Sequence, residues 1–147
     1  MDEAARHVLE LPNDLGAIER SVDYLLDRCR DAGFSERRLR LNFRVGVAEA
    51  LANAMMYGNA RDPGKQVMLE AWIGPGRIRV RITDEGTGFD PDAIPDPTLP
   101  QNRSRARGRG VYLITELMDE VTFNEQGNSI EMVLYAEGES PRTREAS

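Results

Sequence analysis

The fold is decided by residues 45–57, VGVAEALANAMMY. Small and apolar side chains fill this stretch, which predicts the buried far half of a helix running from about Glu36 to Tyr57. Glu49 and Asn53 stand four residues apart and therefore share one face of that helix. Either they form its solvated stripe, or they face a polar cavity, because a carboxylate in apolar surroundings is costly unless paired. In a cavity, Asn53 would offer Mg²⁺ a hard oxygen ligand and Glu49 could accept a proton.

The segments on either side of this helix alternate between helical and strand patterns. A short strand at 7–11 and an amphipathic helix precede it, and the apolar stripe of that helix comprises Leu15, Ile18, Val22, Leu25, Leu26 and Cys29. Strands at 67–73 and 77–83, a helix at 111–118 and a hairpin at 121–124 and 130–136 follow it. Strands and helices segregate, which predicts an α+β fold: a two-layer sandwich with a mixed, mostly antiparallel sheet and helices on one face.

The chain of 147 residues is expected to form a single domain over 1–136, with a flexible, polar tail at 137–147. The net charge of −6 argues against general nucleic-acid binding. One cysteine and one histidine cannot build a zinc site, and no stretch is long and apolar enough to cross a bilayer. The N-terminus lacks the apolar core of a signal peptide, and the lone cysteine suggests a reducing compartment, so the protein is expected to be cytoplasmic.

A second motif, Asp-Glu-Gly-Thr-Gly at 84–88, follows the strand at 77–83. An ionised Asp84 only accepts hydrogen bonds, so it would favour the exocyclic amine of adenine over the carbonyl of guanine. Gly86 and Gly88 would allow the backbone to approach a flat base closely. The alternative is a plain turn, although a turn requires only one glycine.

A third motif, Gly108-Arg109-Gly110, precedes the predicted helix at 111–118. Free backbone N–H groups at the start of a helix bind anions readily. Residues 90–107, which end in an arginine run that includes Arg105, are expected to form a lid or a disordered loop, and arginine can grip phosphate oxygens. The alternative is a flexible basic linker with a capping glycine.

The three motifs occur in one order: E-x-x-x-N in a helix, D-x-G-x-G after a strand and G-x-G before a helix. This order resembles the Bergerat-type ATP-binding fold shared by gyrase, Hsp90, histidine kinases and MutL. Within that superfamily, the chain length and the segments AEALANAMMYGN, RITDEGTGF and RGRGVYLITELMDEV resemble the stand-alone bacterial anti-sigma-factor serine/threonine kinases, the family of SpoIIAB and RsbW.

The resemblance implies a role for each matching residue. Glu49 would be the catalytic base, Asn53 the Mg²⁺ ligand and Asp84 the adenine-reading carboxylate. The remaining nucleotide-binding positions would be Gly86 and Gly88 in the base pocket, Arg105 in the lid, Gly108 and Gly110 at the phosphates, and Ser129 beside the aspartate. Arg20 would contact a protein partner, unless it is simply a solvated residue of the first helix.

The resemblance further implies ATP and Mg²⁺ as cofactors and phosphorylation of a small antagonist protein. It also implies sequestration of a sigma factor or similar regulator by a homodimer, without nucleic-acid or membrane partners. Two other functions stay open. A nucleotide-gated protein-binding module with little or no kinase activity is compatible with residues 90–107, which depart from the family's lids. An RNA-binding loop would require the arginine run to act alone.

Overall fold

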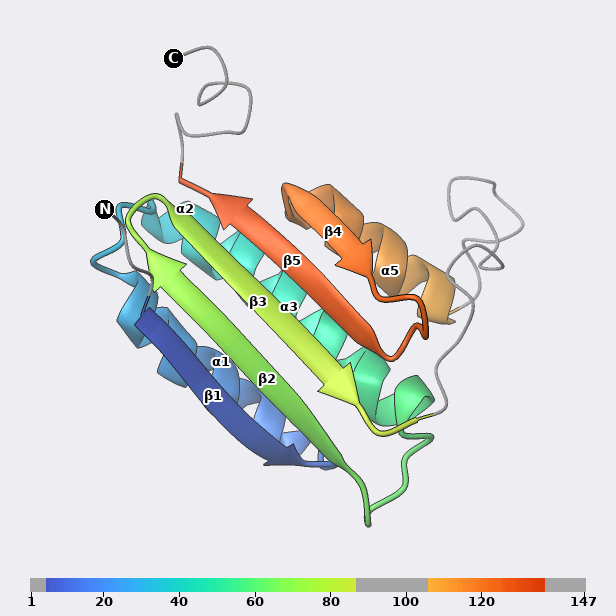
Figure 1. Ribbon diagram of the computed structural model, residues 1–147. Coiled ribbons are helices and arrows are strands. Elements are labelled where there is room, and N and C mark those ends of the chain that lie inside the picture. The colour runs from blue at the N-terminus through green and yellow to red at the C-terminus, as the bar shows by residue number, and fades with distance from the viewer. Residues whose placement is uncertain (1–4, 87–105, 137–147) are drawn as a thin grey trace.

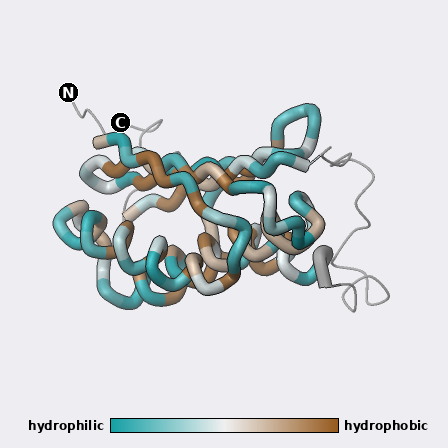
Figure 2. Tube along the Cα trace, turned by 90° about the horizontal axis from the view of Figure 1, so that it is seen from below, coloured by the Kyte–Doolittle hydropathy of each residue, from teal (hydrophilic) through white to brown (hydrophobic). Residues whose placement is uncertain are grey.

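The computed structural model of the protein describes residues 5–86 and 106–136. These residues form two layers, a five-stranded sheet and a set of helices that covers one of its faces (Figures 1 and 2). The strands are β1 Ala5–Pro12, β2 Gln66–Gly74, β3 Arg77–Asp84, β4 Glu120–Phe123 and β5 Ser129–Tyr135. The helices are α1 Gly16–Cys29, α2 Glu36–Arg38, η1 Leu39–Phe43, α3 Arg44–Asn53, η2 Ala54–Gly58 and α5 Ala106–Leu117. The predicted α+β two-layer fold is confirmed.

The sheet has the strand order β1-β2-β3-β5-β4, and each neighbouring pair within the described residues is antiparallel. The side chains of β3 alternate: Ile78, Val80 and Ile82 are buried, whereas the arginines between them are at least partly exposed. The exposed face is held together across strands, because the Glu70 carboxylate accepts hydrogen bonds from Arg6 at 2.7 Å and from Arg81 at 3.1 Å. The hydrogen bond from Arg6 keeps the pKa of Glu70 below its usual value.

The helix predicted over 36–57 is one continuous helical segment from Glu36 to Gly58 that contains two π-helical turns, η1 and η2. Ser35 caps its start by accepting a hydrogen bond from Arg38 N at 3.1 Å. This segment lies behind the middle of the sheet, between α1 and α5 (Figure 1). A long central helix of this kind places one end of α3 and all of η2 near the end of β3.

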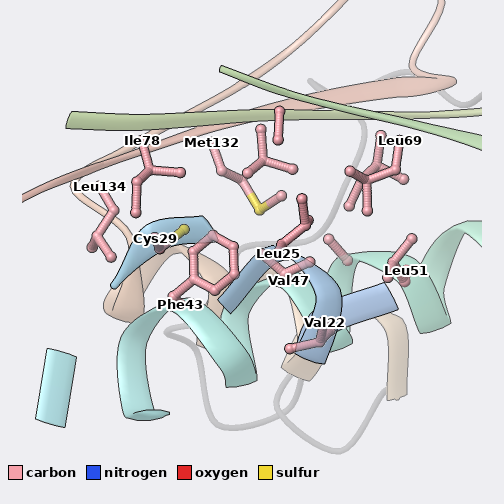
Figure 3. Close-up of a cluster of buried hydrophobic side chains, with 14 of the residues drawn as sticks. Val22, Leu25, Cys29, Phe43, Val47, Leu51, Leu69, Ile78, Met132 and Leu134 are labelled. Carbon is pink, nitrogen blue, oxygen red and sulfur yellow. The ribbon is translucent and has the colours of Figure 1, made fainter. Parts of the chain in front are cut away.

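The core fills the space between the two layers (Figure 3). Val22, Leu25 and Cys29 of α1 meet Phe43, Val47 and Leu51 of the long helical segment beneath the sheet. From the sheet, the core receives Leu69, Ile78, Met132 and Leu134, each at most 1% exposed. Burial of this apolar surface is the main source of stability for the fold.

The two ends of the sheet differ. At one end, Ala5 pairs with Ile73 and Arg77 pairs with Tyr135. The first residue of β1 and the last residue of β5 therefore lie at the same end of the sheet. At the opposite end, Pro12 pairs with Gln66 and Val67 pairs with Asp84. The motif residues of β3 therefore lie at the end remote from the first residue of β1 and the last of β5.

One predicted boundary is wrong. The helix expected at 111–118 begins earlier, because α5 spans Ala106–Leu117 and contains the Gly108–Gly110 motif. Packing of α5 against α3 offsets the roughly 1 kcal/mol that each glycine costs relative to alanine in a helix. Most of the predicted lid and the tail at 137–147 lie outside the described residues. Across residues 5–86 and 106–136, no helix has the length and apolarity needed to span a membrane.

Candidate functional site

Glu49 and Asn53 lie on α3 directly opposite the start of α5. A β-carbon placed at Gly110 would lie 2.9 Å from Asn53 Nδ2, 3.2 Å from Asn53 Oδ1 and 3.3 Å from Glu49 Oε2. The backbone of Gly110 thus approaches both polar side chains closely, which a larger residue would prevent. Of the two alternatives for Glu49 and Asn53, a fully solvated stripe does not fit. Both side chains are only partly exposed, and both face another helix.

Asp84 ends β3 and is 8% exposed, one of four buried polar or charged residues in the described part of the chain. Its Oδ1 accepts a hydrogen bond from Gly86 N at 2.8 Å. The other carboxylate oxygen faces the end of η2, because a β-carbon at Gly58 would lie only 2.1 Å from Asp84 Oδ2. A β-carbon at Gly86 would in turn lie 1.9 Å from Gly58 O, so the two glycines and the carboxylate interlock.

A small pocket of about 30 Å³, open to solvent, joins these parts. Its walls come from α3 and η2, the end of β3, α5 and the β4–β5 hairpin. The lining residues are Ala50, Asn53, Ala54, Ile82, Asp84, Val111, Ile114, Phe123, Gly127, Asn128, Ser129 and Ile130. Most of the lining is apolar, and the polar residues are Asn53, Asp84, Asn128 and Ser129, a composition typical of small-molecule sites.

The Gly108–Gly110 motif is helical, not a turn before the helix. The first N–H groups of an α-helix have no partner within the helix, and the positive end of its dipole lies there. Gly108 belongs to this first turn of α5, so a helix start suited to an anion still lies beside the pocket. Gly110 has a different position, packed against Glu49 and Asn53.

Ser129 lines the pocket, but its hydroxyl lies 2.9 Å from Thr83 Oγ1 on the neighbouring strand. Thr83 points to the sheet face opposite to Asp84, since successive strand residues alternate. Asn128 pairs with the backbone of Asp84: Asp84 N donates to Asn128 O at 2.9 Å, and Asn128 Nδ2 donates to Asp84 O at 3.4 Å. Ser129 stays a predicted nucleotide contact, and Asn128 is a further pocket residue that the sequence did not indicate.

The remaining predicted residues lie elsewhere. Arg20 is exposed on α1, where its guanidinium donates to Gly16 O of the same helix at 3.1 Å. Gly88 and Arg105 lie outside the described residues.

Sequence reasoning also missed the two residues that end η2. Gly58 sits against Asp84, and Asn59 is fully buried with its side chain hydrogen-bonded to three segments. A Gly-Asn pair indicates only the end of a helix. The partners Asp84 and Glu85 lie far along the chain, so no local pattern in the sequence reveals these contacts.

The residues present fit a nucleotide with a magnesium ion. Asn53 lines the pocket and supplies a hard oxygen of the kind that Mg²⁺ prefers. No group of three or more histidine, cysteine or acidic side chains that could hold a metal exists among the described residues. A metal here would therefore take its other ligands from water and phosphate oxygens, as Mg²⁺ commonly does.

Comparison with known proteins agrees with the fold. Residues 11–134 match the family described as the histidine kinase-like ATPase domain. The serine-protein kinase RsbW of Staphylococcus epidermidis is 33% identical over 107 residues, which cover 67% of this chain and 67% of that protein. RsbW of Bacillus subtilis is 30% identical over 105 residues, covering 67% of this chain and 66% of the relative. The chain thus spans about two thirds of the length of these relatives.

Among solved structures, the RsbU and RsbW domains of Rv1364c from Mycobacterium tuberculosis resemble this fold with a TM-score of 0.57. The match covers 90% of this chain and 31% of that longer chain, at 16% sequence identity. At this identity the likeness concerns the fold alone.

Proposed function

Because the chain belongs to the family of histidine kinase-like ATPase domains, we propose that it is an ATP-dependent protein serine/threonine kinase. Its pocket binds ATP with Mg²⁺ and transfers the γ-phosphoryl group to a hydroxyl of a small antagonist protein. In the same regulatory system, the protein sequesters a sigma factor or a similar regulator. The relatives named above are serine-protein kinases, which supports this choice of reaction.

The observation that carries the proposal is that residues of all three motifs lie in one pocket or directly beside it. Asn53 from α3 and Asp84 from β3 line it, and Gly110 of α5 touches both Asn53 and Glu49. A binding protein would need the base-reading carboxylate and the phosphate-binding helix start, but not a carboxylate at Glu49 beside them. The position of Glu49 therefore favours phosphoryl transfer.

Each residue has a distinct task in this mechanism. Asp84 accepts a hydrogen bond from the exocyclic amine of adenine, while the apolar side chains of Ile82, Val111 and Ile114 contact the base. Asn53 Oδ1 would hold Mg²⁺, whose positive charge would offset that of the phosphate groups. The first turn of α5, with Gly108, donates N–H groups to the phosphates.

Glu49 acts on the attacking hydroxyl. Its carboxylate accepts the proton of the substrate serine or threonine as the hydroxyl oxygen bonds to the γ-phosphorus. The bond between the γ-phosphorus and the bridging oxygen breaks, and ADP leaves. The proximity of Glu49 to Gly110 supports this role, because Gly110 belongs to the helix that we propose to bind the phosphates.

The partners follow from the family and stand as proposals. Arg20 on the exposed surface of α1 contacts a protein partner, and the functional unit is a cytoplasmic homodimer. Arg105 and Gly88 complete the nucleotide site.

The test separates binding from transfer. Calorimetry with Mg·ATP measures binding, and labelled ATP with antagonist-domain proteins of the same organism measures transfer. Glu49→Gln keeps the shape of the side chain, so we expect ATP affinity within about twofold of wild type but a loss of transfer of about 10²–10⁴-fold. Glu116→Gln, on the exposed side of α5, is the matched control.

Undiminished transfer by Glu49→Gln would remove Glu49 from the mechanism. If the wild-type chain binds ATP but transfers no phosphate to any antagonist protein, the nucleotide-gated binding module is the better description. Failure of the wild-type chain to bind ATP would exclude both functions.

A further inference from the structure

Asn59, the residue after η2, is a buried side chain with three hydrogen-bond partners. It is 0% exposed, and its backbone N–H closes the helix by donating to Ala54 O at 2.7 Å. Its side-chain oxygen accepts a hydrogen bond from Glu85 N at 2.7 Å. Its amide nitrogen donates to Gln66 O at 2.9 Å and to Asn13 Oδ1 at 3.3 Å. One amide thus joins the helix end to the β1–α1 turn, the start of β2 and the residue after Asp84.

The bond to Glu85 fixes the backbone that carries Asp84. Gly86 N, one residue further on, donates to Asp84 Oδ1, and the backbone of Gly58 lies against Asp84 Oδ2. The direction of the carboxylate therefore depends on where the chain runs after β3 and on how closely the end of η2 approaches it. Asn59 influences both, because its side chain is bonded to Glu85 after β3 and its backbone directly follows the end of η2.

The chain after Asn59 adopts a conformation that depends on this anchor. Ala60 and Arg61 have φ angles of 52° and 61°, in the left-handed region that residues other than glycine rarely adopt. The bend is closed by Arg61 N, which donates to Met55 O at 2.9 Å, and by Asp62 N, which donates to Asn59 O at 3.0 Å. A strained bend of this kind persists where the surrounding bonds determine it.

We infer that Asn59 is a positioning residue that aligns Asp84 for the adenine amine and so determines both affinity for ATP and selectivity against GTP. The inference rests on the proposed function. Asn59 lines neither the pocket nor the space before Gly110, so it acts through Glu85 and Asp84 without touching the nucleotide. Such a contact depends on direction, because a carboxylate that is turned away loses the amine and still repels the guanine carbonyl.

The test compares Asn59→Ala with Asn13→Ala in the full chain. Asn13 belongs to the same network, since its amide donates to Asp62 O at 2.9 Å and to Met55 O at 3.3 Å, but it has no bond to Glu85. Both variants should lower the melting temperature. Calorimetry should show ATP binding weakened about tenfold in Asn59→Ala, a loss that corresponds to one well-aligned hydrogen bond. In Asn13→Ala, ATP binding should weaken by no more than about twofold. Binding of GTP should change by less than about twofold in either variant.

A third variant keeps the inference testable if Asn59→Ala does not fold. Asn59→Asp retains an acceptor for Glu85 N but loses both amide donors, so it should be destabilised and yet bind ATP within about threefold of wild type. A loss of ATP affinity that follows melting temperature equally across all folded variants would overturn the inference and make Asn59 purely structural. Wild-type affinity in Asn59→Ala would do so as well. Absence of ATP binding by the wild-type chain would instead overturn the proposed function, and the inference with it.

Discussion

At the residue scale, the contact between Gly58 and Asp84 sets the shape of the base end of the pocket. A helix end and a strand end approach so closely there that a β-carbon on Gly58 would lie 2.1 Å from Asp84 Oδ2. The obstacle is a buried carboxylate whose other oxygen is held by Gly86 N, so it cannot simply swing aside. Glycine at 58 is therefore required by space, whatever its effect on helix stability.

Replacement of Gly58 by alanine should displace Asp84. Overpacking of this kind typically costs about 1–3 kcal/mol of unfolding free energy. The displaced carboxylate should also weaken binding of ATP by about tenfold or more, since the hydrogen-bond direction is lost. Urea unfolding and calorimetry with Mg·ATP measure the two effects. Gly64→Ala, in an exposed loop where a β-carbon would lie no closer than 3.3 Å to another atom, is the control. Normal ATP affinity in Gly58→Ala would contradict the assigned contact.

Cys29 makes a separate prediction for stability at high pH. Burial raises the pKa of this thiol from about 9 to about 12. The folded protein therefore holds the proton more tightly than the unfolded chain, and this stabilising contribution is complete below pH 9. It is lost as pH rises through 12, by at most roughly 1.4 kcal/mol per pH unit. Denaturant titrations from pH 8 to 11 should show a steeper fall in wild type than in Cys29→Ala, and equal slopes would contradict the prediction.

At the scale of elements, the segment that follows α5 fastens this helix to the rest of the fold. Asp119 Oδ2 accepts hydrogen bonds from Arg38 Nη2 and from Tyr135 N, both at 2.7 Å. Asn42 donates to Leu117 O at the last turn of α5, also at 2.7 Å. These bonds hold the C-terminal end of α5, whereas its N-terminal end lies at the pocket. The helix is anchored at the end that takes no part in the proposed chemistry.

Asp119→Ala should therefore affect stability more than binding. It removes a charged hydrogen-bond acceptor from two donors, which should lower the unfolding free energy by about 2 kcal/mol. ATP affinity should stay within about twofold of wild type because the pocket residues are unchanged. Urea unfolding and calorimetry measure these quantities, with Glu116→Ala on an exposed position of α5 as control. A large loss of ATP affinity without a loss of stability would show that this anchor acts on the pocket.

Some helices and strands could be predicted from the sequence, and others could not. Strand β3 and helix α1 were predictable because their patterns repeat every two residues or every three to four, and each repeat is local. The start of α5 was not, because Gly108 and Gly110 favour a turn when considered alone. Asn59 was missed for another reason: its partner Glu85 lies 26 residues further along the chain, and no local pattern reports a bond over that distance.

At the scale of the whole molecule, ligand binding should stabilise the fold. The pocket is assembled from both layers, so a bound nucleotide would connect α3, α5 and the sheet. A ligand at about 100 times its dissociation constant adds about 2.7 kcal/mol to the stability of the folded state. Thermal unfolding should therefore shift upward with increasing Mg·ATP and much less with Mg·GTP. Glu49→Gln should retain the shift, and an equal response to GTP would contradict the role of Asp84.

The ends of the sheet have a consequence for how this domain can be joined to others. Ala5 and Tyr135 lie together at one end, and the pocket beside Asp84 lies at the other. Polypeptide fused before β1 or after β5 would therefore emerge away from the mouth of the pocket. A fold laid out in this way can be inserted into larger architectures as an interchangeable module, and its neighbours can diverge without reshaping its chemistry.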